Sequence, residues 1–182
     1  EQKFNNIVDY GGGFGTLARL IAQKDSALKI DIYEPYPSEF GIRRAAEFDN
    51  IDIIEELGEG YDCLMSTDVL EHVLDPLHDL YSMVKSIKLN GYLVINAPFF
   101  PMIKCHLPQN FHFRYTFNLF AKLMGLEVID RVKDSPQTIY KKISNIEPDW
   151  KKIRFFENMS ILVFPVLELT KIILSPALRF FT

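Results

Sequence analysis

Near its amino-terminal end the chain reads Ile7-Val8-Asp9-Tyr10-Gly11-Gly12-Gly13-Phe14-Gly15-Thr16-Leu17-Ala18. A short apolar strand runs into an acidic residue, a glycine cluster and the apolar start of a helix. Glycine has no Cβ and tolerates positive φ, so such a turn lets the backbone approach a ligand closely. The free N–H groups at the start of the following helix favour electron-rich ligand groups. The stretch therefore predicts a strand–turn–helix unit that binds a small ligand at the turn.

Two motifs overlap in this turn. Read as D-x-G-x-G-x-G, the stretch supplies Asp9, Gly11, Gly13 and Gly15, and it resembles motif I of class I S-adenosylmethionine-dependent methyltransferases. Read as G-x-G-x-x-A, with Gly13, Gly15 and Ala18, it matches the dinucleotide-binding fingerprint. The turn by itself leaves both interpretations open.

Length and composition limit the possible classes of protein. With 182 residues and 48% apolar side chains, the chain is expected to form one domain with a packed core. A net charge of −4 argues against a broad nucleic-acid-binding surface. Cys63 and Cys105 lack metal-type spacing and are expected to be reduced, buried thiols of a cytoplasmic protein. The chain starts at Glu1 without a methionine, so we expect that an upstream segment, including part of a substrate lid, is missing.

Strand and helix patterns alternate over the first two-thirds of the chain. Apolar runs predict strands at 7–10, 29–34, 62–66, 92–97 and 126–132. A further strand falls either at 45–48 or at 51–54, and a last one at 138–143, at 161–166 or beyond the chain. Helices are predicted at 16–23, 76–90 and 116–125. This alternation indicates a doubly wound, mostly parallel α/β sheet, in which ligands bind beyond the carboxyl ends of the strands.

Local signals mark the ends and inner faces of the helices. Asp75 and Pro76 are typical of a helix start, Asn90-Gly91 of a helix end, and Thr116 of a further start. Helical spacing predicts that the following residues face the core: Leu17, Leu20, Ile21, Leu77, Leu80, Val84, Ile87, Phe117 and Phe120.

An acidic residue closes the second predicted strand. Glu34 follows Asp31-Ile32-Tyr33, and it lies at the spacing from the glycine turn at which a carboxylate accepts hydrogen bonds from a ribose diol. A nicotinamide dinucleotide and S-adenosylmethionine both carry that diol. Glu34 is therefore predicted to bind ribose without distinguishing the two cofactors.

A second motif follows the strand predicted at 62–66. The run reads Ser66-Thr67-Asp68-Val69-Leu70-Glu71-His72-Val73-Leu74-Asp75-Pro76. It resembles the D-V-L-E-H-V-x-D-P segment of the methyltransferase group that contains ubiquinone-pathway O-methyltransferases, and 89–98 is similar to that group's later glycine turn and strand. The resemblance extends from residue 7 to about residue 131. It implies a seven-stranded Rossmann-like methyltransferase sheet, whose last strand is antiparallel and possibly incomplete here, and a methyl donor, S-adenosylmethionine, that leaves as S-adenosylhomocysteine.

The same resemblance assigns roles to individual residues. Asp9 and the backbone of Gly11, Gly12 and Gly13 would hold the methionine part of the cofactor, and Glu34 its ribose. Thr67 and Asp68 would border the methionine and the transferable methyl group. Asp68 is expected to engage the methionine amine or the acceptor rather than the sulfur, because a carboxylate at the sulfonium would stabilise the ground state more than the transition state. Adenine would contact Asp49 or Asn50, after the third strand.

Four histidines are candidates for acid–base chemistry. His78 lies on the polar side of its helix, and His72 is expected to pack at a helix entry. His106 and His112 lie in a loop that should face the acceptor, so either is a candidate general base, with a structural role as the alternative.

Asp68, Glu71 and His72 also form a D-x-x-E-H pattern. It resembles the E-x-x-E-H metal sites of some ubiquinone-pathway and small-RNA methyltransferases, with a later histidine as a further ligand. Carboxylates plus imidazole would suit magnesium or manganese. The first acid is shorter here, and L-E-H-V also occurs in relatives thought to be metal-free. The favoured expectation is therefore a site without a metal.

The composition changes after residue 145. Residues 1–145 are predicted to form the S-adenosylmethionine-binding core, and 146–182 an apolar, mostly helical extension of the same domain. The extension would pack on the sheet or in a dimer. Alternatively, it would contact a lipid-like acceptor or the membrane interface as a peripheral surface.

Together these patterns predict an S-adenosylmethionine-dependent methyltransferase that methylates a small molecule at a hydroxyl oxygen by in-line displacement. Two alternatives remain at this level. One is an NAD(P)-dependent oxidoreductase that uses the overlapping glycine motif, and the other is a catalytically silent scaffold that binds S-adenosylmethionine.

Overall fold

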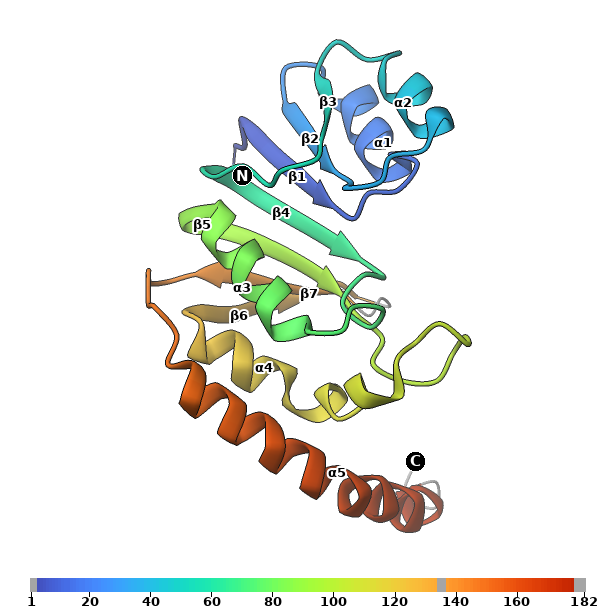
Figure 1. Cartoon of the computed structure of the whole chain (residues 1–182), viewed down its shortest axis with the longest axis vertical. Helices are drawn as coiled ribbons and strands as arrows, with labels where there is room; N and C mark the ends of the chain where they lie inside the picture. Colours follow the sequence, from blue (N-terminus) through green and yellow to red (C-terminus); the bar gives the residue numbers. More distant parts are fainter. Residues whose placement is uncertain (1–2, 134–136, 179–182) are drawn as a thin grey trace.

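A single mixed sheet forms the centre of the molecule. The computed structural model describes residues 3–133 and 137–178. Within them, seven strands pair in the order β3-β2-β1-β4-β5-β7-β6 (Figure 1). All pairs from β3 to β5 are parallel, whereas β7 is antiparallel to both β5 and β6. The strands are β1 (Asn6–Tyr10), β2 (Lys29–Tyr33), β3 (Ile51–Ile54), β4 (Tyr61–Thr67), β5 (Ile87–Asn96), β6 (Leu126–Arg131) and β7 (Thr138–Lys142). The predicted seven-stranded α/β sheet with an antiparallel last strand is confirmed.

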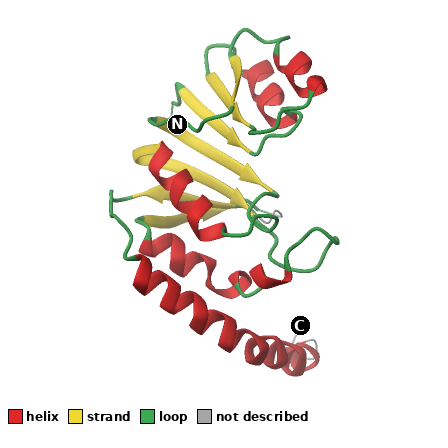
Figure 2. Ribbon diagram, in the orientation of Figure 1, coloured by secondary structure: helices red, strands yellow, loops and turns green. Residues whose placement is uncertain are grey.

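Helices cover the two faces of the sheet unequally (Figure 2). They are α1 (Thr16–Lys24), α2 (Glu39–Ala45), α3 (Pro76–Ser86), α4 (Phe113–Leu123) and α5 (Trp150–Leu178), with a short 3₁₀ turn, η1 (Pro108–Asn110). Helices α1 and α2 lie beside β1–β3, whereas α3 and α4 lie against β4–β7, and α5 runs along the outside of α4 (Figure 1).

Alternating side chains of the strands build two separate cores. Ile7 belongs to the core under α1 and α2, and its neighbour Val8 belongs to the larger core under α3 and α4. The larger core contains Phe113 and Phe120, which meet edge to face, and it reaches Ile153 on α5. Period-two burial of this kind follows from the pleat of a strand covered on both faces.

Helix α1 presents a different face to the sheet from the one predicted. Ala18 and Ala22 are buried, whereas Leu17 and Leu20 remain 36% and 55% exposed. Ala18 and Ala22 belong to the core that Ile30 and Ile32 of β2 also build, so the alanine face of α1 lies against the sheet and the two leucines point outward. The prediction that Leu17 and Leu20 face the core is therefore wrong.

Helix α3 starts as predicted and ends earlier. The Asp75 side chain accepts the His78 backbone N–H at 3.1 Å, with Pro76 in the first turn. The helix stops at Ser86, and Ile87 already pairs with β4. The buried Lys142 ammonium donates to the carbonyl oxygens of Val84 and Ile87 at 2.8 and 2.9 Å, so a distant strand satisfies this helix end. The predicted end at Asn90-Gly91 is wrong.

The structure settles the bounds of four further elements. The third strand lies at 51–54 and the last at 138–142, which selects one of the open alternatives in each case. Helix α4 begins at Phe113, so Thr116 lies within it and donates to the His112 carbonyl oxygen, contrary to its predicted capping role. Helix α2, which no sequence pattern predicted, starts where Ser38 accepts the Gly41 backbone N–H.

Helix α5 carries many exposed apolar side chains. Phe155, Met159, Leu162, Val166 and Leu169 are between 42% and 71% exposed, and they recur every three or four residues. Among the described residues, no helix combines the length and apolar character needed to cross a bilayer.

Candidate active site

The glycine turn after β1 adopts the backbone that its sequence predicts. Gly11 and Gly13 have φ values of 69° and 53°, in the left-handed region that favours glycine. The Gly11 N–H donates to the Tyr33 carbonyl oxygen at 2.8 Å, which ties the turn to β2. A Cβ at Gly11 would stand 2.6 Å from Val69, so the loop after β4 packs directly on this turn.

Glu34 lies at the glycine turn rather than in open solvent. Its half-buried carboxylate accepts the Gly13 N–H at 3.2 Å through one oxygen and the Tyr36 N–H at 3.3 Å through the other. The end of β2 thus delivers an acceptor group to the turn after β1. A carboxylate in this position offers two oxygens to a vicinal diol.

Asp9 is the buried acid of the site. Its side chain is 4% exposed. Burial raises the pKa of Asp9 to about 6, and a hydrogen bond with the Ala18 backbone opposes part of that shift. A positive group bound nearby would compensate the buried charge and lower the pKa again.

Thr67 is the last residue of β4, and Asp68 follows it. Both are exposed, and Asp68 has a φ of 56°, which is uncommon for a residue with a side chain. Two contacts to Asn96 at the end of β5 hold Asp68 there. The Asp68 backbone N–H donates to the Asn96 carbonyl oxygen at 3.0 Å, and the Asn96 amide donates to the Asp68 carboxylate at 2.9 Å.

A cavity of about 470 Å³ opens beside the turn. Its polar wall includes Asp9, Gly11, Gly12 and Thr67, and its apolar wall includes Leu17, Met65 and Val94. Four of the predicted cofactor residues therefore line one space. The exposed Leu17 that the sequence assigned to the core forms part of its wall.

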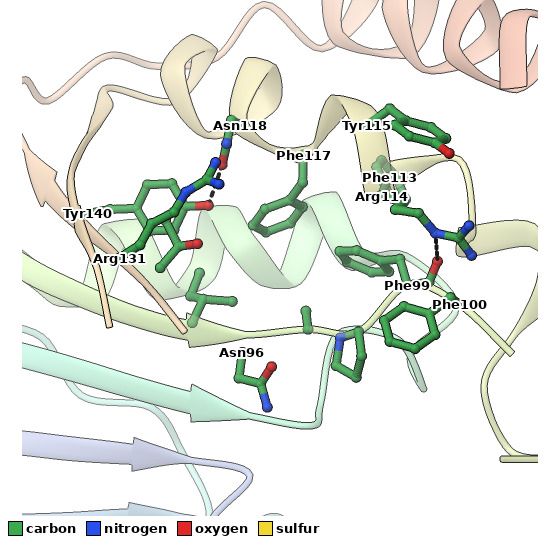
Figure 3. Close-up of a pocket in the computed structure, with 14 residues that line it drawn as sticks. Asn96, Phe99, Phe100, Phe113, Arg114, Tyr115, Phe117, Asn118, Arg131 and Tyr140 are labelled. Atoms are coloured by element: carbon green, nitrogen blue, oxygen red, sulfur yellow. Dashed lines mark hydrogen bonds between the residues drawn. The ribbon is translucent and has the colours of Figure 1, made fainter. Parts of the chain in front are cut away.

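A second cavity, of about 240 Å³, lies between the end of β5 and helix α4 (Figure 3). Phe99, Phe100 and Phe117 supply aromatic surface. Arg131 lies beside Tyr140, whose hydroxyl donates to the Asn118 side chain at 2.6 Å. Asn96, which holds Asp68, lines this cavity as well.

The two histidines predicted as general bases line neither of these cavities. His112 is 4% exposed, and its Nδ1 lies 2.8 Å from the Ser160 hydroxyl of α5. Burial lowers the pKa of His112 to about 4, which suits a neutral, structural imidazole. His106 is also buried, with its Nδ1 2.7 Å from the Phe100 carbonyl oxygen. Neither imidazole is placed to meet an acceptor in these cavities.

The structure does not bring Asp49 to this edge of the sheet. Asp49 precedes β3 and therefore lies at the amino edge of the parallel strands, opposite the glycine turn. Asn50 donates to the Leu28 carbonyl oxygen at 2.8 Å in the same region. Glu55 and Glu56 are exposed and directly follow β3, so they lie at the carboxyl edge of the parallel strands, where a contact to adenine was expected. Assigning the strand to 51–54 would have identified them.

Comparisons with known proteins agree with this geometry. The family model described as "Methyltransferase domain" matches residues 1–118. No curated protein sequence is significantly similar to the chain. A S-adenosylmethionine-dependent methyltransferase from Aquifex aeolicus has a TM-score of 0.61 at 15% identity, over 77% of this chain and 82% of its own. An O-methyltransferase family protein from Burkholderia thailandensis has a TM-score of 0.55 at 17% identity, over 80% and 52%. At these identities the likeness establishes the fold.

Several similar structures are much longer than this chain. It spans 52% of the Burkholderia protein and 35% of the O-methyltransferase of a Brevibacillus brevis multienzyme, which was solved with S-adenosyl-L-homocysteine. The latter match has a TM-score of 0.45 at 20% identity and covers 50% of this chain.

Proposed function

Since the chain belongs to the methyltransferase-domain family, we propose that it transfers the methyl group of S-adenosylmethionine to a hydroxyl oxygen of a small molecule. One observation carries this proposal. The left-handed glycine turn, capped at the Gly13 N–H by the Glu34 carboxylate, lies next to a cavity that Asp9 and Thr67 also line. S-adenosylmethionine has a ribose diol and an amino-acid tail. Glu34 can accept hydrogen bonds from the diol, Asp9 can pair with the ammonium group of the tail, and the glycine turn leaves room for the nucleoside.

The geometry suggests how the cofactor would lie. The ammonium group of the methionine would enter the cavity towards Asp9, whose buried carboxylate forms no ion pair with the described residues, and Glu34 would accept hydrogen bonds from the ribose. The adenine would then extend past β3, where Glu55 or Glu56 can accept from its amino group. These two residues replace Asp49 as candidates for that contact.

Catalysis of methyl transfer depends first on how the methyl donor and the acceptor are positioned. A sulfonium is a good leaving group, and holding donor and acceptor in line can contribute roughly 7–11 kcal/mol of the barrier reduction. A hydroxyl acceptor must also lose its proton, and a placed base contributes about 10²–10⁴-fold. Because His106 and His112 face elsewhere, we assign this role to Asp68. It follows Thr67 of the first cavity and is hydrogen-bonded to Asn96 of the second.

The second cavity suggests the chemical class of the acceptor. Its aromatic surface suits an aromatic or aliphatic body, and Arg131 supplies a positive charge at its far side. A hydroxylated ring that carries an anionic group fits this combination. The acceptor would place its hydroxyl towards Asn96 and Asp68, where the two cavities approach each other through the Asn96–Asp68 contact.

The raised pKa of Asp9 makes cofactor affinity depend on pH. In the free protein the carboxyl is half protonated near pH 6, whereas a bound ammonium group requires the carboxylate. Affinity for S-adenosylhomocysteine should therefore rise with pH through about 6, and be about tenfold weaker at pH 5 than at pH 7. Asp9→Asn should bind weakly with a flat profile when titrated calorimetrically.

Protein stability provides the control for that experiment. A carboxyl whose pKa is raised on folding contributes stability below its unfolded pKa, and this contribution is lost as the pH rises through about 6. Asp9→Asn removes the buried charge, so at pH 7 its free energy of unfolding should equal or exceed that of the parent. A steep pH dependence of affinity that survives in Asp9→Asn would contradict the assigned role.

Calorimetry also tests the proposed cofactor. S-adenosylhomocysteine should bind with one site per chain, and NAD should produce no measurable heat. Binding of NAD alone would favour the oxidoreductase. A labelled methyl donor offered with a panel of hydroxylated aromatic acids then separates an enzyme from a silent scaffold, because only an enzyme labels an acceptor.

Helix α5 remains the candidate surface for a larger partner. Its exposed apolar side chains, such as Leu162 and Val166, are suited to a lipid-like acceptor, a membrane interface or a second copy of the helix. Contact with a membrane, the oligomeric state, the cytoplasmic location and the division at residue 145 remain predictions from sequence.

A further inference from the structure

Two loops bring one carboxylate and two imidazoles together outside both cavities. Glu71 and His72 follow β4, and His106 follows β5. One ligating atom from each side chain lies within 4.8 Å of the others. The Glu71 Oε1 atom is 3.9 Å from Nε2 of His72 and 4.0 Å from Nε2 of His106. None of the three residues lines either cavity of the candidate active site.

Backbone carbonyls fix the orientation of both imidazoles. The Nδ1 atom of His72 lies 3.1 Å from the Cys105 carbonyl oxygen, and that of His106 lies 2.7 Å from the Phe100 carbonyl oxygen. A carbonyl oxygen can only accept, so each Nδ1 carries the hydrogen. In a neutral ring the lone pair is then on Nε2, and both Nε2 atoms face Glu71. Metal-ligating histidines are oriented in the same way by acceptors at the opposite nitrogen.

The carboxylate between them lacks partners within the described part of the chain. Glu71 is fully buried, and neither of its oxygens has a hydrogen bond. A buried carboxylate and two imidazole lone pairs converge here without a donor among them. A cation between them would satisfy all three.

We propose that Glu71, His72 and His106 bind a divalent transition-metal ion. Two imidazoles and one carboxylate suit Zn²⁺, Fe²⁺ or Mn²⁺, whereas Mg²⁺ prefers an all-oxygen shell. The His72 side chain is 30% exposed, so water or a ligand can complete the coordination from that side. Ligand atoms of a tetrahedral zinc site lie about 3.4 Å apart, given metal–nitrogen distances of ~2.0–2.1 Å. The three ligating atoms lie between 3.9 and 4.8 Å apart, so pairs of them would have to approach by about 0.5–1.4 Å on binding the ion.

The surrounding loops hold the site in place. The Leu107 N–H donates to the Glu71 carbonyl oxygen at 3.0 Å, and the buried Asn110 amide donates to the Val73 carbonyl oxygen at 2.9 Å. The ion would add a third link between the loop after β4 and the loop after β5. Asp68 is not part of the site, because its carboxylate is held by Asn96. The site therefore shares Glu71, His72 and a later histidine with the D-x-x-E-H pattern of the sequence, but it does not include Asp68.

The test is a Zn²⁺ titration of the full chain against a chromophoric chelator. It is done in a Cys105→Ser background, because the Cys105 thiol next to His106 could bind zinc by itself. This thiol is exposed, contrary to the prediction from sequence, whereas Cys63 is buried as predicted. We expect one tight site per chain for Zn²⁺, weaker binding of Mn²⁺, and no competition from millimolar Mg²⁺. Glu71→Gln should weaken Zn²⁺ binding by about 100-fold or more. His78→Gln, which changes an exposed histidine outside the cluster, should bind as its parent does.

Thermal unfolding distinguishes a lost ligand from a damaged fold. Zn²⁺ should raise the melting temperature of the parent and of His78→Gln, but not that of Glu71→Gln. Without metal, Glu71→Gln should melt no lower than the parent, since it removes a buried carboxylate that lacks hydrogen bonds. Two results would overturn the proposal. One is equal Zn²⁺ affinity in the parent and Glu71→Gln. The other is a parent that does not bind Zn²⁺ tightly. In that case a destabilised Glu71→Gln variant would identify a proton-bearing carboxyl–imidazole pair.

Discussion

A Gly13→Leu variant is expected to lose affinity for S-adenosylhomocysteine by roughly 5- to 160-fold while remaining folded. Gly13 has a φ of 53°, and a Cβ there would meet no heavy atom within 4 Å. The leucine side chain would therefore occupy the open space over the turn, where the proposal places the nucleoside. Forcing a ligand against such a side chain costs roughly 1–3 kcal/mol, as overpacking does in a protein core. Calorimetric titration measures the loss directly.

Gly60 offers a matched control for this variant. Its φ is 86°, and a Cβ would also meet nothing within 4 Å. It immediately precedes β4, at the amino edge of the sheet and away from the turn. Gly60→Leu should thus carry a similar backbone strain and a similar fall in melting temperature, with unchanged affinity. Full affinity in Gly13→Leu, or equal losses in both variants, would show that the cofactor lies elsewhere.

The order of the elements was predictable from sequence because it depends on local patterns. The Asp75–Pro76 start of α3 and the apolar strands at 7–10 and 62–66 appear in the structure close to their predicted positions. The errors occur where distant residues decide. Helix α3 ends at Ser86 because Lys142, on β7, satisfies its carbonyl groups. The apolar pattern, in contrast, continues through Ile87 without interruption, since strand and helix are both buried there.

The face of α1 shows a second limit of periodicity. Leucines usually mark the inner face of a helix, but here Ala18 and Ala22 are buried and Leu17 and Leu20 are exposed. Periodicity alone does not reveal which of two adjoining apolar faces of a helix meets the sheet. It also does not reveal that Leu17 lines a cavity instead of packing in the core.

The candidate site was predictable where a residue's role follows from its place at a strand end. Glu34 and the glycine turn meet because parallel strands deliver their carboxyl ends to one edge. Asp49 was misplaced because the register of β3 was undecided. The roles of His106 and His112 depend on what each buried ring faces, and those partners, Phe100 and Ser160, are not evident from a linear pattern.

A Glu34→Gln variant is expected to weaken binding of S-adenosylhomocysteine by about 10–100-fold. The substitution keeps the size of the side chain but leaves one acceptor oxygen and removes the charge. Each hydrogen bond to a charged group is worth roughly 1.5–3 kcal/mol. The remaining amide oxygen can still accept the Gly13 N–H, which now bonds to the Glu34 carboxylate at 3.2 Å, so the turn should keep its shape. Glu127→Gln, an exposed change on β6, controls for the loss of one negative charge.

A change in the ligand makes this test specific for the ribose. An analogue of S-adenosylhomocysteine that lacks the ribose 2′-hydroxyl should bind the parent protein more weakly, because one of the two hydroxyl groups facing Glu34 is gone. In Glu34→Gln the same analogue should lose little further affinity, since the partner of that hydroxyl has already been weakened. The two changes are thus expected to be non-additive, which marks a direct contact. Additive losses would mean that Glu34 acts only by holding the glycine turn through the Gly13 N–H, and that the ribose lies beyond its reach.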